Sequence, residues 1–279
     1  MATITKRFDP KRISLSSLYR SDELDHWDEP FRSSRRREIY GTLNLPPIEK
    51  GRLYQAGCFV SSIDGSITYP DSSDGSQVAK RNLTDPAGAD SDFWVLNMLQ
   101  NAMDCVITGT KTLMSAPLYR AGMADEQLCR DRESAAGSPL PLLVVLTKGG
   151  DSFPFEHPLL ASRNQQIVVA STEQGKEYLA SRLPEHVQVM PCGVDRVETA
   201  LLNRKLYDMG MRRVLVESPS WCRQLMKQGE LDELFLTTSS VVIGDHSAEQ
   251  LPSPLAMTSR ILSVHIHPPG FLFVRYQFN

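Results

Sequence analysis

The stretch Asp104-Cys-Val-Ile-Thr-Gly-Thr-Lys-Thr112 decides the fold class of this 279-residue chain. Its first half is an apolar run of strand length, and its second half carries the small and hydroxylated residues that begin a helical turn. Free backbone N–H groups and the positive end of a helix favour an anion at such a junction. Because ligands of open α/β sheets gather at the carboxyl ends of strands, the candidate phosphate-binding residues are Gly109, Thr110, Lys111 and Thr112. Plain helix capping is the alternative interpretation.

From Arg52 onward, short apolar runs alternate with stretches of helical periodicity, which predicts an α/β fold with a predominantly parallel central sheet flanked by helices. The spacing predicts helices from about Asp92 to Met103, from Asp195 to Gly210 and from Ser220 to Gln228. Residues 121–141 and 148–158 are expected to form surface loops. The predicted strands are Tyr54–Ser61, Asp104–Thr108, Leu142–Thr147, Ile167–Ala170, Val187–Met190, Arg213–Glu217, Glu233–Val242, Ile261–His267 and Phe271–Phe278. Pro268-Pro-Gly270 predicts an antiparallel hairpin of the last two strands.

The first fifty residues have little sustained periodicity, so residues 1–50 are expected to form an N-terminal extension to one domain over residues 51–279. The triplet Arg35-Arg-Arg37 suggests a nucleic-acid arm when taken alone. The acidic run Asp22–Glu29 just before it largely cancels that charge. An extension that packs on the main domain, or is partly mobile, is therefore the preferred interpretation.

The overall charge argues against large charged partners. The chain has 30 basic and 33 acidic side chains, a formal net charge of −3, which gives no electrostatic footprint for nucleic acid or an anionic membrane. No apolar run approaches the ~20 residues of a membrane span. The five cysteines form no C-x-x-C pair, and no signal-peptide core is visible. We therefore expect a cytoplasmic protein without a disulfide framework.

Three further segments could carry chemistry. Strand Val214–Val216 runs into Glu217-Ser-Pro-Ser220 and a helix, which repeats the strand-to-helix junction described above. The turn Ser61-Ser-Ile-Asp-Gly65 follows the first predicted strand, and Thr147-Lys148 follows another. An ordinary Asp-Gly turn and a solvated strand end are the alternatives. The chain has no G-x-G-x-x-G and no G-x-x-x-x-G-K-[ST], so neither common nucleotide fingerprint is present.

In their order along the chain, these segments resemble the reductase domain of the bifunctional riboflavin-biosynthesis deaminase/reductase, a branch of the dihydrofolate-reductase-like fold. The resemblance runs from Arg52 to the C-terminus. The deaminase half is absent, because no H-x-E followed by P-C-x-x-C occurs. The matching pieces are Ser62-Ile-Asp-Gly65, Asp104–Thr112, Val214-Leu-Val-Glu217, Leu231-Asp-Glu-Leu-Phe-Leu-Thr-Thr238 with Ile243-Gly244, and Gly270-Phe-Leu-Phe-Val-Arg-Tyr276.

The resemblance implies NADPH as the hydride donor and a pyrimidine or related heterocycle as the substrate. It also implies a homodimer built around the C-terminal strands. The cofactor diphosphate would lie at Gly109–Thr112 and at Glu217, Ser218, Pro219 and Ser220, and the 2′-phosphate would lie near Thr147, Lys148 and Lys111. The substrate would lie near Ser62, Asp64, Gly65 and Arg120. Asp64 is the first candidate for orienting or protonating it, and no metal is expected.

Three departures from the family pattern bear on binding. Where the family has Glu-Gly-Gly-Pro, this chain has Glu217-Ser-Pro-Ser220, which is bulkier and loses an amide donor at Pro219. Gln100 stands in the place of the family's arginine, and Arg120 is displaced from the usual spacing. A phosphorylated pyrimidine is therefore expected to bind poorly unless Arg120 or Arg81 folds into the cleft. The alternatives are a reductase of another small molecule in a secondary pathway and a catalytically silent nucleotide-binding protein.

Three other features favour structural interpretations. His265-x-His267 could form a metal pair, but a surface strand is preferred because no third ligand lies nearby in the sequence. The acidic pair Asp232-Glu233 at a strand start is expected to be structural. Trp221, beside a helix start, is expected to pack in the core.

Overall fold

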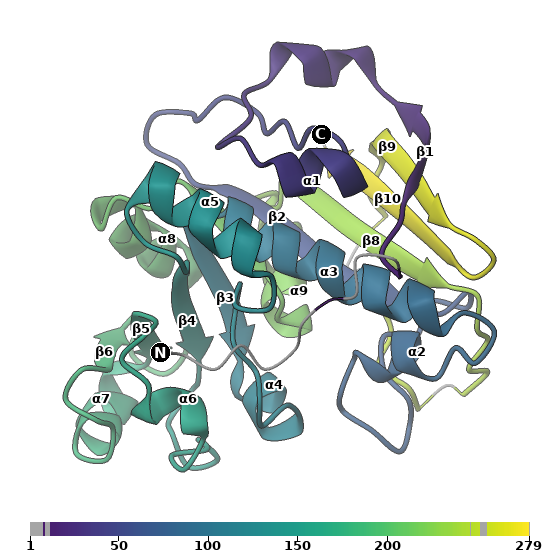
Figure 1. The fold of residues 1–279 in the computed structure, drawn as a ribbon. Coiled ribbons are helices and arrows are strands. Elements are labelled where there is room, and N and C mark those ends of the chain that lie inside the picture. The colour runs from purple at the N-terminus through teal and green to yellow at the C-terminus, as the bar shows by residue number, and fades with distance from the viewer. Residues whose placement is uncertain (1–7, 9–11, 246, 252–255, 279) are drawn as a thin grey trace.

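A ten-stranded sheet forms the centre of the molecule in the computed structural model, which describes residues 8, 12–245, 247–251 and 256–278 (Figure 1). The strand order is β1-β9-β10-β8-β2-β7-β3-β4-β5-β6. All pairs from β8 to β6 are parallel, and β8, β10, β9 and β1 pair antiparallel. The strands are β1 Ser16–Arg20, β2 Tyr54–Ser61, β3 Cys105–Gly109, β4 Leu142–Leu146, β5 Ile167–Ser171, β6 Gln188–Pro191, β7 Arg213–Val216, β8 Glu233–Ser239, β9 Ser259–His267 and β10 Phe271–Phe278. The predicted fold class and the C-terminal hairpin are confirmed.

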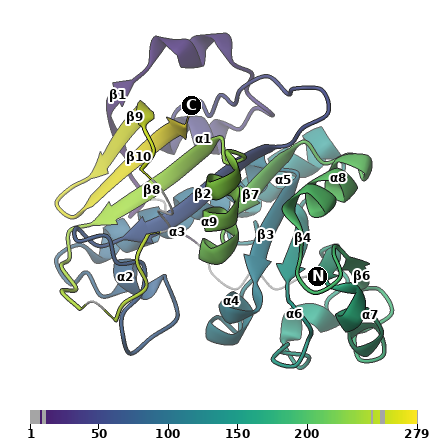
Figure 2. The same cartoon turned by 180° about the vertical axis from the view of Figure 1, so that it is seen from behind.

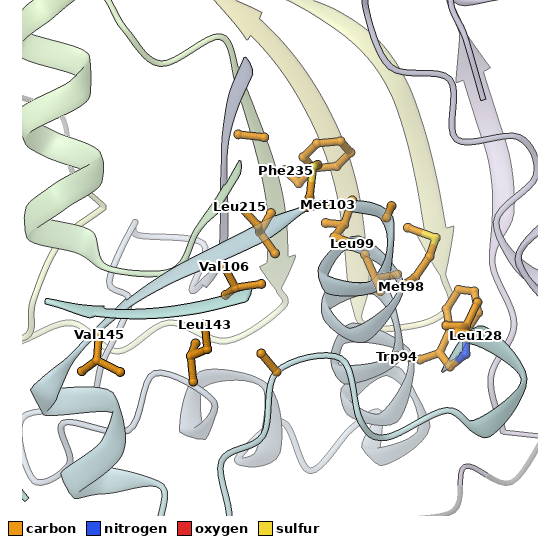
Figure 3. Packing of buried hydrophobic residues seen from close by; sticks show 14 of the residues in the cluster. Trp94, Met98, Leu99, Met103, Val106, Leu128, Leu143, Val145, Leu215 and Phe235 are labelled. Atoms are coloured by element: carbon orange, nitrogen blue, oxygen red, sulfur yellow. The ribbon is translucent and has the colours of Figure 1, made fainter. Parts of the chain in front are cut away.

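Helices cover both faces of the parallel part, which is why its strands are almost continuously apolar. On one face α3 (Pro86–Ala102) and α5 (Glu126–Ala136) lie over the sheet (Figure 1), and on the other lie α8 (Thr199–Asp208) and α9 (Pro219–Gln228) (Figure 2). A hydrophobic cluster lies on each face of the sheet, and alternate residues of β3 belong to different clusters. Val106 belongs to the cluster on the side of α3, and Ile107 belongs to the cluster on the other side. Figure 3 shows Leu99 of α3 near Met103 and Phe235, and Trp94 beside Leu128 of α5.

The remaining helices are short or belong to the edges. The predicted helical turn after Gly109 is present as α4. The expected loop over residues 148–157 contains no helix, and α6 begins at its end. The short helices are α1 Ser34–Ile39, α2 Gln77–Lys80, α4 Thr110–Ser115, α6 Pro158–Ala161, α7 Glu173–Ala180 and a 3-10 helix over Asp22–His26.

Two predicted helix starts are wrong. Helix α3 begins at Pro86 rather than Asp92, because the Asp85 side chain caps it by accepting from the Gly88 N–H at 2.8 Å. Helix α8 begins at Thr199 rather than at the predicted Asp195. The Glu198 N–H donates to the Cys192 carbonyl at 2.7 Å, which closes the intervening residues into a loop before the helix starts.

The segment over residues 121–141, expected to be a surface loop, contains α5 instead. Asp125 caps this helix through the N–H groups of Gln127 and Leu128. Gly137 ends it in the left-handed region at φ 72°. Among its residues only Leu128 and Arg132 are buried, so the helix lacks the apolar periodicity on which a sequence prediction depends.

The described part of the N-terminal region joins the main sheet. Strand β1, which the sequence analysis missed, pairs with β9 (Figure 1), and Leu43 and Leu45 are fully buried in the core under α3. The arginines of the triplet are paired with acidic groups: Arg36 and Arg37 with Glu29, and Arg35 with Asp125 and Glu38. Their charges are therefore largely neutralised within the protein. Over the residues that the structure covers, no helix is both long and apolar enough to cross a membrane.

Candidate active site

A cavity of about 870 Å³ opens between α3 and the carboxyl ends of β2, β3 and β7. Ligand sites of proteins commonly measure about 300–1,000 Å³, so this cavity has room for a large ligand or for two. Both strand-to-helix junctions predicted as anion sites line it. The lining residues from these junctions are Gly109, Thr110, Lys111, Thr112, Glu217, Ser218, Pro219 and Ser220.

These two junctions lie side by side because β3 and β7 are adjacent parallel strands, with Ile107 paired with Val216. They approach so closely that a Cβ atom on Gly109 would lie 3.7 Å from the Ser218 Oγ. The Ser218 side chain caps α9 by accepting from the Trp221 N–H. Pro219 has no N–H, so the Ser220 amide is the first-turn donor that the described hydrogen bonds leave for a ligand.

Glu217 lies at the end of β7 and holds the two walls of the cavity together. Its Oε1 accepts from Gln100 Nε2 at 2.7 Å, and its Oε2 accepts from the Tyr119 hydroxyl at 2.8 Å. Burial raises the pKa of Glu217 to about 7, against the two hydrogen bonds, which lower it. The carboxyl group therefore exchanges a proton near neutral pH.

Asp92 is a second carboxyl group of the cavity, and the sequence analysis assigned it no role. It lies on the face of α3 that carries Leu96 and Gln100 at intervals of four residues. Burial raises its pKa to about 6, and a hydrogen bond with Thr237 of β8 lowers it. The signal that could have identified Asp92 is an acidic residue on the inward face of an otherwise apolar helix.

The cavity also contains cationic groups, Lys111 and Arg120 among them. Arg120 Nη1 donates to the Tyr119 carbonyl at 2.8 Å, and burial lowers the pKa of the guanidinium. Arg81 instead pairs with Asp71 and stacks over Tyr69 with 4.3 Å to the ring centroid. Of the two arginines that could replace the missing family arginine, Arg120 reaches the cavity and Arg81 does not line it.

Other residues predicted for the site do not line the cavity: Ser62, Asp64 and Gly65. Asp64 accepts from the N–H groups of Ile243 and Gly244 at 3.1 and 2.8 Å. Hydrogen bonds, the one with Ser62 being the largest contribution, lower its pKa to about 2. The lowered pKa argues against Asp64 as a proton donor, and its role in orienting or protonating the substrate stays a prediction.

Thr147 and Lys148 lie just outside the cavity. Leu146, which lines the cavity, pairs with Gly109, and Thr147 is the next residue of the chain. The Lys148 side chain is exposed, and its carbonyl accepts from the hydroxyls of Ser171 and Thr172. The predicted contact with a 2′-phosphate is therefore at the rim and stays a prediction.

Of the residues expected to be structural, the two histidines differ from the expectation, whereas Trp221 and Glu233 agree with it. His265 and His267 are buried rather than on a surface strand: His265 Nε2 lies 3.0 Å from the Tyr40 carbonyl, and His267 Nδ1 lies 2.8 Å from Asp85 Oδ2. The described residues contain no group of three or more His, Cys, Asp or Glu side chains that could hold a metal ion. Trp221 is buried in the core, as predicted. Glu233 is bound by Arg275, which confirms its structural role.

The strand order, the antiparallel C-terminal strands and the cavity at the carboxyl ends of β2, β3 and β7 define a dihydrofolate-reductase-like α/β protein. The chain belongs to the RibD C-terminal domain family, whose model matches residues 58–270. It is 22% identical over 176 residues to the 2,5-diamino-6-ribosylamino-4(3H)-pyrimidinone 5′-phosphate reductase of Methanothermobacter thermautotrophicus, which covers 63% of this chain and 77% of that protein. The predicted family is confirmed.

Solved structures show the same fold. A pyrimidine reductase-like protein from Corynebacterium diphtheriae has a TM-score of 0.68 and 19% identity, over 88% of this chain and 98% of that one. The diaminohydroxyphosphoribosylaminopyrimidine deaminase/5-amino-6-(5-phosphoribosylamino)uracil reductase of Thermotoga maritima has a TM-score of 0.59 and 14% identity, over 82% of this chain and 58% of that one. The part of that protein left unmatched agrees with the absence of a deaminase motif here.

Proposed function

We propose that this protein is an NADPH-dependent reductase of a pyrimidine intermediate that carries a sugar phosphate. The observation that carries the proposal is a cavity lined by both anion-binding junctions and by carboxyl groups that include Asp92 and Glu217. The named activity of the Methanothermobacter relative supports the choice of substrate class. The expected riboflavin-type reaction is the simplest member of that class.

The residues around the two junctions fit a dinucleotide diphosphate. Thr110, Thr112 and Ser220 offer hydroxyl donors beside Lys111, and the amino end of α9 adds a favourable dipole. When bound, NADPH supplies the hydride. The protein must position the two ligands, exclude water and provide one proton. Glu217 has its pKa near 7 inside the cavity, so it can hold and transfer that proton.

Arg120 is the group that we assign to the substrate phosphate. An arginine grips a phosphate through two parallel N–H donors, and Arg120 has no carboxylate among the hydrogen bonds of the described residues. The presence of Arg120 in the cavity lining supports binding of a phosphorylated pyrimidine. Removing the phosphate from the substrate should lower kcat/KM by about tenfold or more.

Cofactor binding is tested by titrating NADPH and NADH against intrinsic fluorescence, to which Trp221 beside Ser218 contributes. We expect tighter binding of NADPH, because Lys111 and Lys148 lie near the place expected for a 2′-phosphate. Equal affinities would remove that assignment. NADPH oxidation is then followed with the pyrimidine ribosyl phosphate and with its dephosphorylated form.

Two other functions make different predictions in the same assays. A reductase of another small molecule, which the loop Glu217-Ser-Pro-Ser220 and the exchange at Gln100 favour, would bind NADPH but oxidise it with neither compound. A silent nucleotide-binding protein would bind NADPH and oxidise it with no heterocycle at all. Failure to bind either nucleotide would refute the proposed function.

We further propose that the protein is a homodimer. The face of β8, β10 and β9 that points away from α3 carries no helix (Figure 2), and Leu272 and Ile261 are exposed on these strands. Leu18 and Tyr19 of β1 extend the exposed apolar surface. A second copy of the chain would cover this surface. Leu272→Arg should shift the mass measured by analytical ultracentrifugation from dimer to monomer, and an unchanged mass would place the interface elsewhere.

A further inference from the structure

Asp92 stands out among the carboxyl groups of the molecule because of what surrounds it. Apolar residues line the same cavity as Asp92, among them Leu96 on the same helix and Cys58 and Val60 on β2. The hydrogen bond that the described residues give it comes from Thr237, which pairs with Val60 in the sheet. No salt bridge to Asp92 forms within the part of the chain that the structure describes.

Buried carboxylates elsewhere in the protein are bound by stronger donors. Glu233 is held by the guanidinium of Arg275, and Asp104 accepts from the N–H groups of Arg212 and Arg213 at 2.8 and 2.9 Å. A carboxylate has about four acceptor sites, and one hydroxyl leaves most of those on Asp92 unused. Those unused sites are left for a ligand in the cavity that Asp92 lines.

We propose that Asp92 binds the edge of the substrate heterocycle and selects pyrimidines that present a ring N–H beside an exocyclic amino group. This inference rests on the proposed function. Two adjacent N–H donors match the two oxygens of a carboxylate in a bidentate pair. A carbonyl in place of the amino group removes one donor and directs its lone pairs at the carboxylate, so the corresponding uracil is disfavoured.

The position of Asp92 on α3 indicates which edge of the heterocycle it meets. Gln100, which binds Glu217 beside the diphosphate junction, lies eight residues further along the helix. Eight residues of α-helix span about 12 Å. Arg120, which we assign to the substrate phosphate, follows Tyr119, which also binds Glu217, so we place Asp92 at the end of the substrate that is remote from the phosphate. In a pyrimidine with a sugar at position 6, that end is the N3–C2 edge.

The test compares two substrates that differ at this edge: 2,5-diamino-6-ribosylamino-4(3H)-pyrimidinone 5′-phosphate and 5-amino-6-(5-phosphoribosylamino)uracil. In the unmodified protein we expect kcat/KM to be about 100-fold higher for the diamino compound. Asp92→Asn presents one acceptor and one donor, so it should abolish most of that preference, chiefly by losing the diamino compound. Equal use of both compounds by the unmodified protein, or an unchanged preference in Asp92→Asn, would overturn the inference.

Calorimetric binding of the two compounds measures the selection without turnover. Selective binding that Asp92→Asn abolishes would support the inference even if NADPH is not oxidised, an outcome that would refute only the proposed reduction. Binding of both compounds with equal affinity would overturn the inference while leaving the reductase intact.

Asp90→Asn is the matched control. Asp90 lies on the same helix, also lines the cavity and pairs with Arg12 at 3.0 Å. The same loss of charge there should leave the substrate preference unchanged. A thermal scan separates binding from a structural role: Asp92→Asn removes a half-buried charge that has no salt bridge among the described residues, so the melting temperature should rise or stay level. A marked fall would make Asp92 a structural residue and overturn the inference.

Discussion

The two edges of the parallel sheet treat buried acidic groups in opposite ways. At the amino-terminal edge, Glu233 at the start of β8 lies in a bidentate ion pair with Arg275, at 2.6 and 3.0 Å. Asp232 there accepts from Arg52 and from the Gln55 N–H. At the carboxyl edge, Glu217 has a hydroxyl and an amide as its partners among the described residues. Glu233 is therefore neutralised by a cation, whereas Glu217 is left able to titrate and to bind a ligand. Asp232 is intermediate, because burial raises its pKa to about 6 against the effect of Arg52.

The largest expected effect comes from breaking the paired edge. Arg275→Met would leave Glu233 buried without its cation, and the Arg275 Nη1 bond to the Asn44 carbonyl would also be lost. We expect the free energy of unfolding to fall by about 3–5 kcal/mol, measured by urea denaturation. The double variant Arg275→Met/Glu233→Gln should recover a large part of that loss. A single variant as stable as the unmodified protein would contradict the comparison.

At the carboxyl edge of the sheet, a substitution that removes a charge should lower turnover rather than stability. Glu217→Gln keeps the shape and an acceptor for Gln100, presents an amide donor instead of an acceptor to the Tyr119 hydroxyl, and removes the proton that we assign to the reaction. We expect kcat to fall by about 10²-fold or more, with the NADPH dissociation constant changed much less. Steady-state kinetics and fluorescence titration measure the two quantities. Loss of cofactor affinity with unchanged kcat would show that Glu217 only binds the nucleotide.

Glu217 also predicts how stability depends on pH. Its pKa is raised from 4.5 to about 7 in the folded state, so the folded protein binds more protons than the unfolded chain between these values. Stability contributed by this group is therefore present below about pH 4.5 and is lost as pH rises through about 7.

Gln100→Arg would give Glu217 a cationic partner, as Arg275 does for Glu233. Because Gln100 Nε2 already touches Glu217, an arginine there would pair with that carboxylate rather than reach the substrate. The pKa of Glu217 should fall, the loss of stability between pH 5 and 7 should shrink, and kcat should drop by about tenfold. Unfolding and kinetics across this pH range measure both effects. Better use of a phosphorylated substrate would instead support a guanidinium that faces the ligand.

Local sequence was enough to predict the frame of the site and not its chemistry. The junctions at Gly109 and Glu217 are contiguous motifs, and the parallel pairing of β3 and β7 brings them together. The partners of Glu217 are distant in the chain, Tyr119 and Gln100, and no local pattern predicts that they meet. Asp92 was missed for a different reason: its role depends on the apolar surroundings that the fold gives it, whereas the sequence shows only an acidic residue on a helix.

Contacts between distant parts of the chain also explain why β1 and the hydrogen bonds of Asp64 were not predicted. Strand β1 is almost fully exposed along its length, so it lacks the alternation that identifies a half-buried strand, and only its pairing with β9 makes it regular. The Ser62–Gly65 turn was visible in the sequence. The binding of its carboxylate to Ile243 and Gly244, about 180 residues later in the chain, was not.

The smallest expected effect is that of a substitution at Asp64. It tests whether a carboxylate outside the cavity also acts on the substrate. Asp64 is exposed, outside the cavity, and its pKa is already lowered to about 2 by hydrogen bonds, so it resembles the paired edge rather than the titratable one. Asp64→Asn keeps an acceptor for one of the two N–H groups, so we expect kcat to change by less than about tenfold, with NADPH affinity unchanged.

The contribution of Asp64 to stability is present above about pH 4 and is lost as pH falls toward 2, so the variant should differ from the unmodified protein least in acid. Asp64→Ala, which removes both acceptors, should loosen the Ile243–Gly244 segment and show faster amide exchange there. If turnover by Asp64→Asn instead falls by about 10²-fold or more while cofactor binding stays normal, Asp64 is a substrate-orienting carboxylate. The division between the two edges would then fail, because a fully hydrogen-bonded acid outside the cavity would have the role assigned to Asp92 and Glu217.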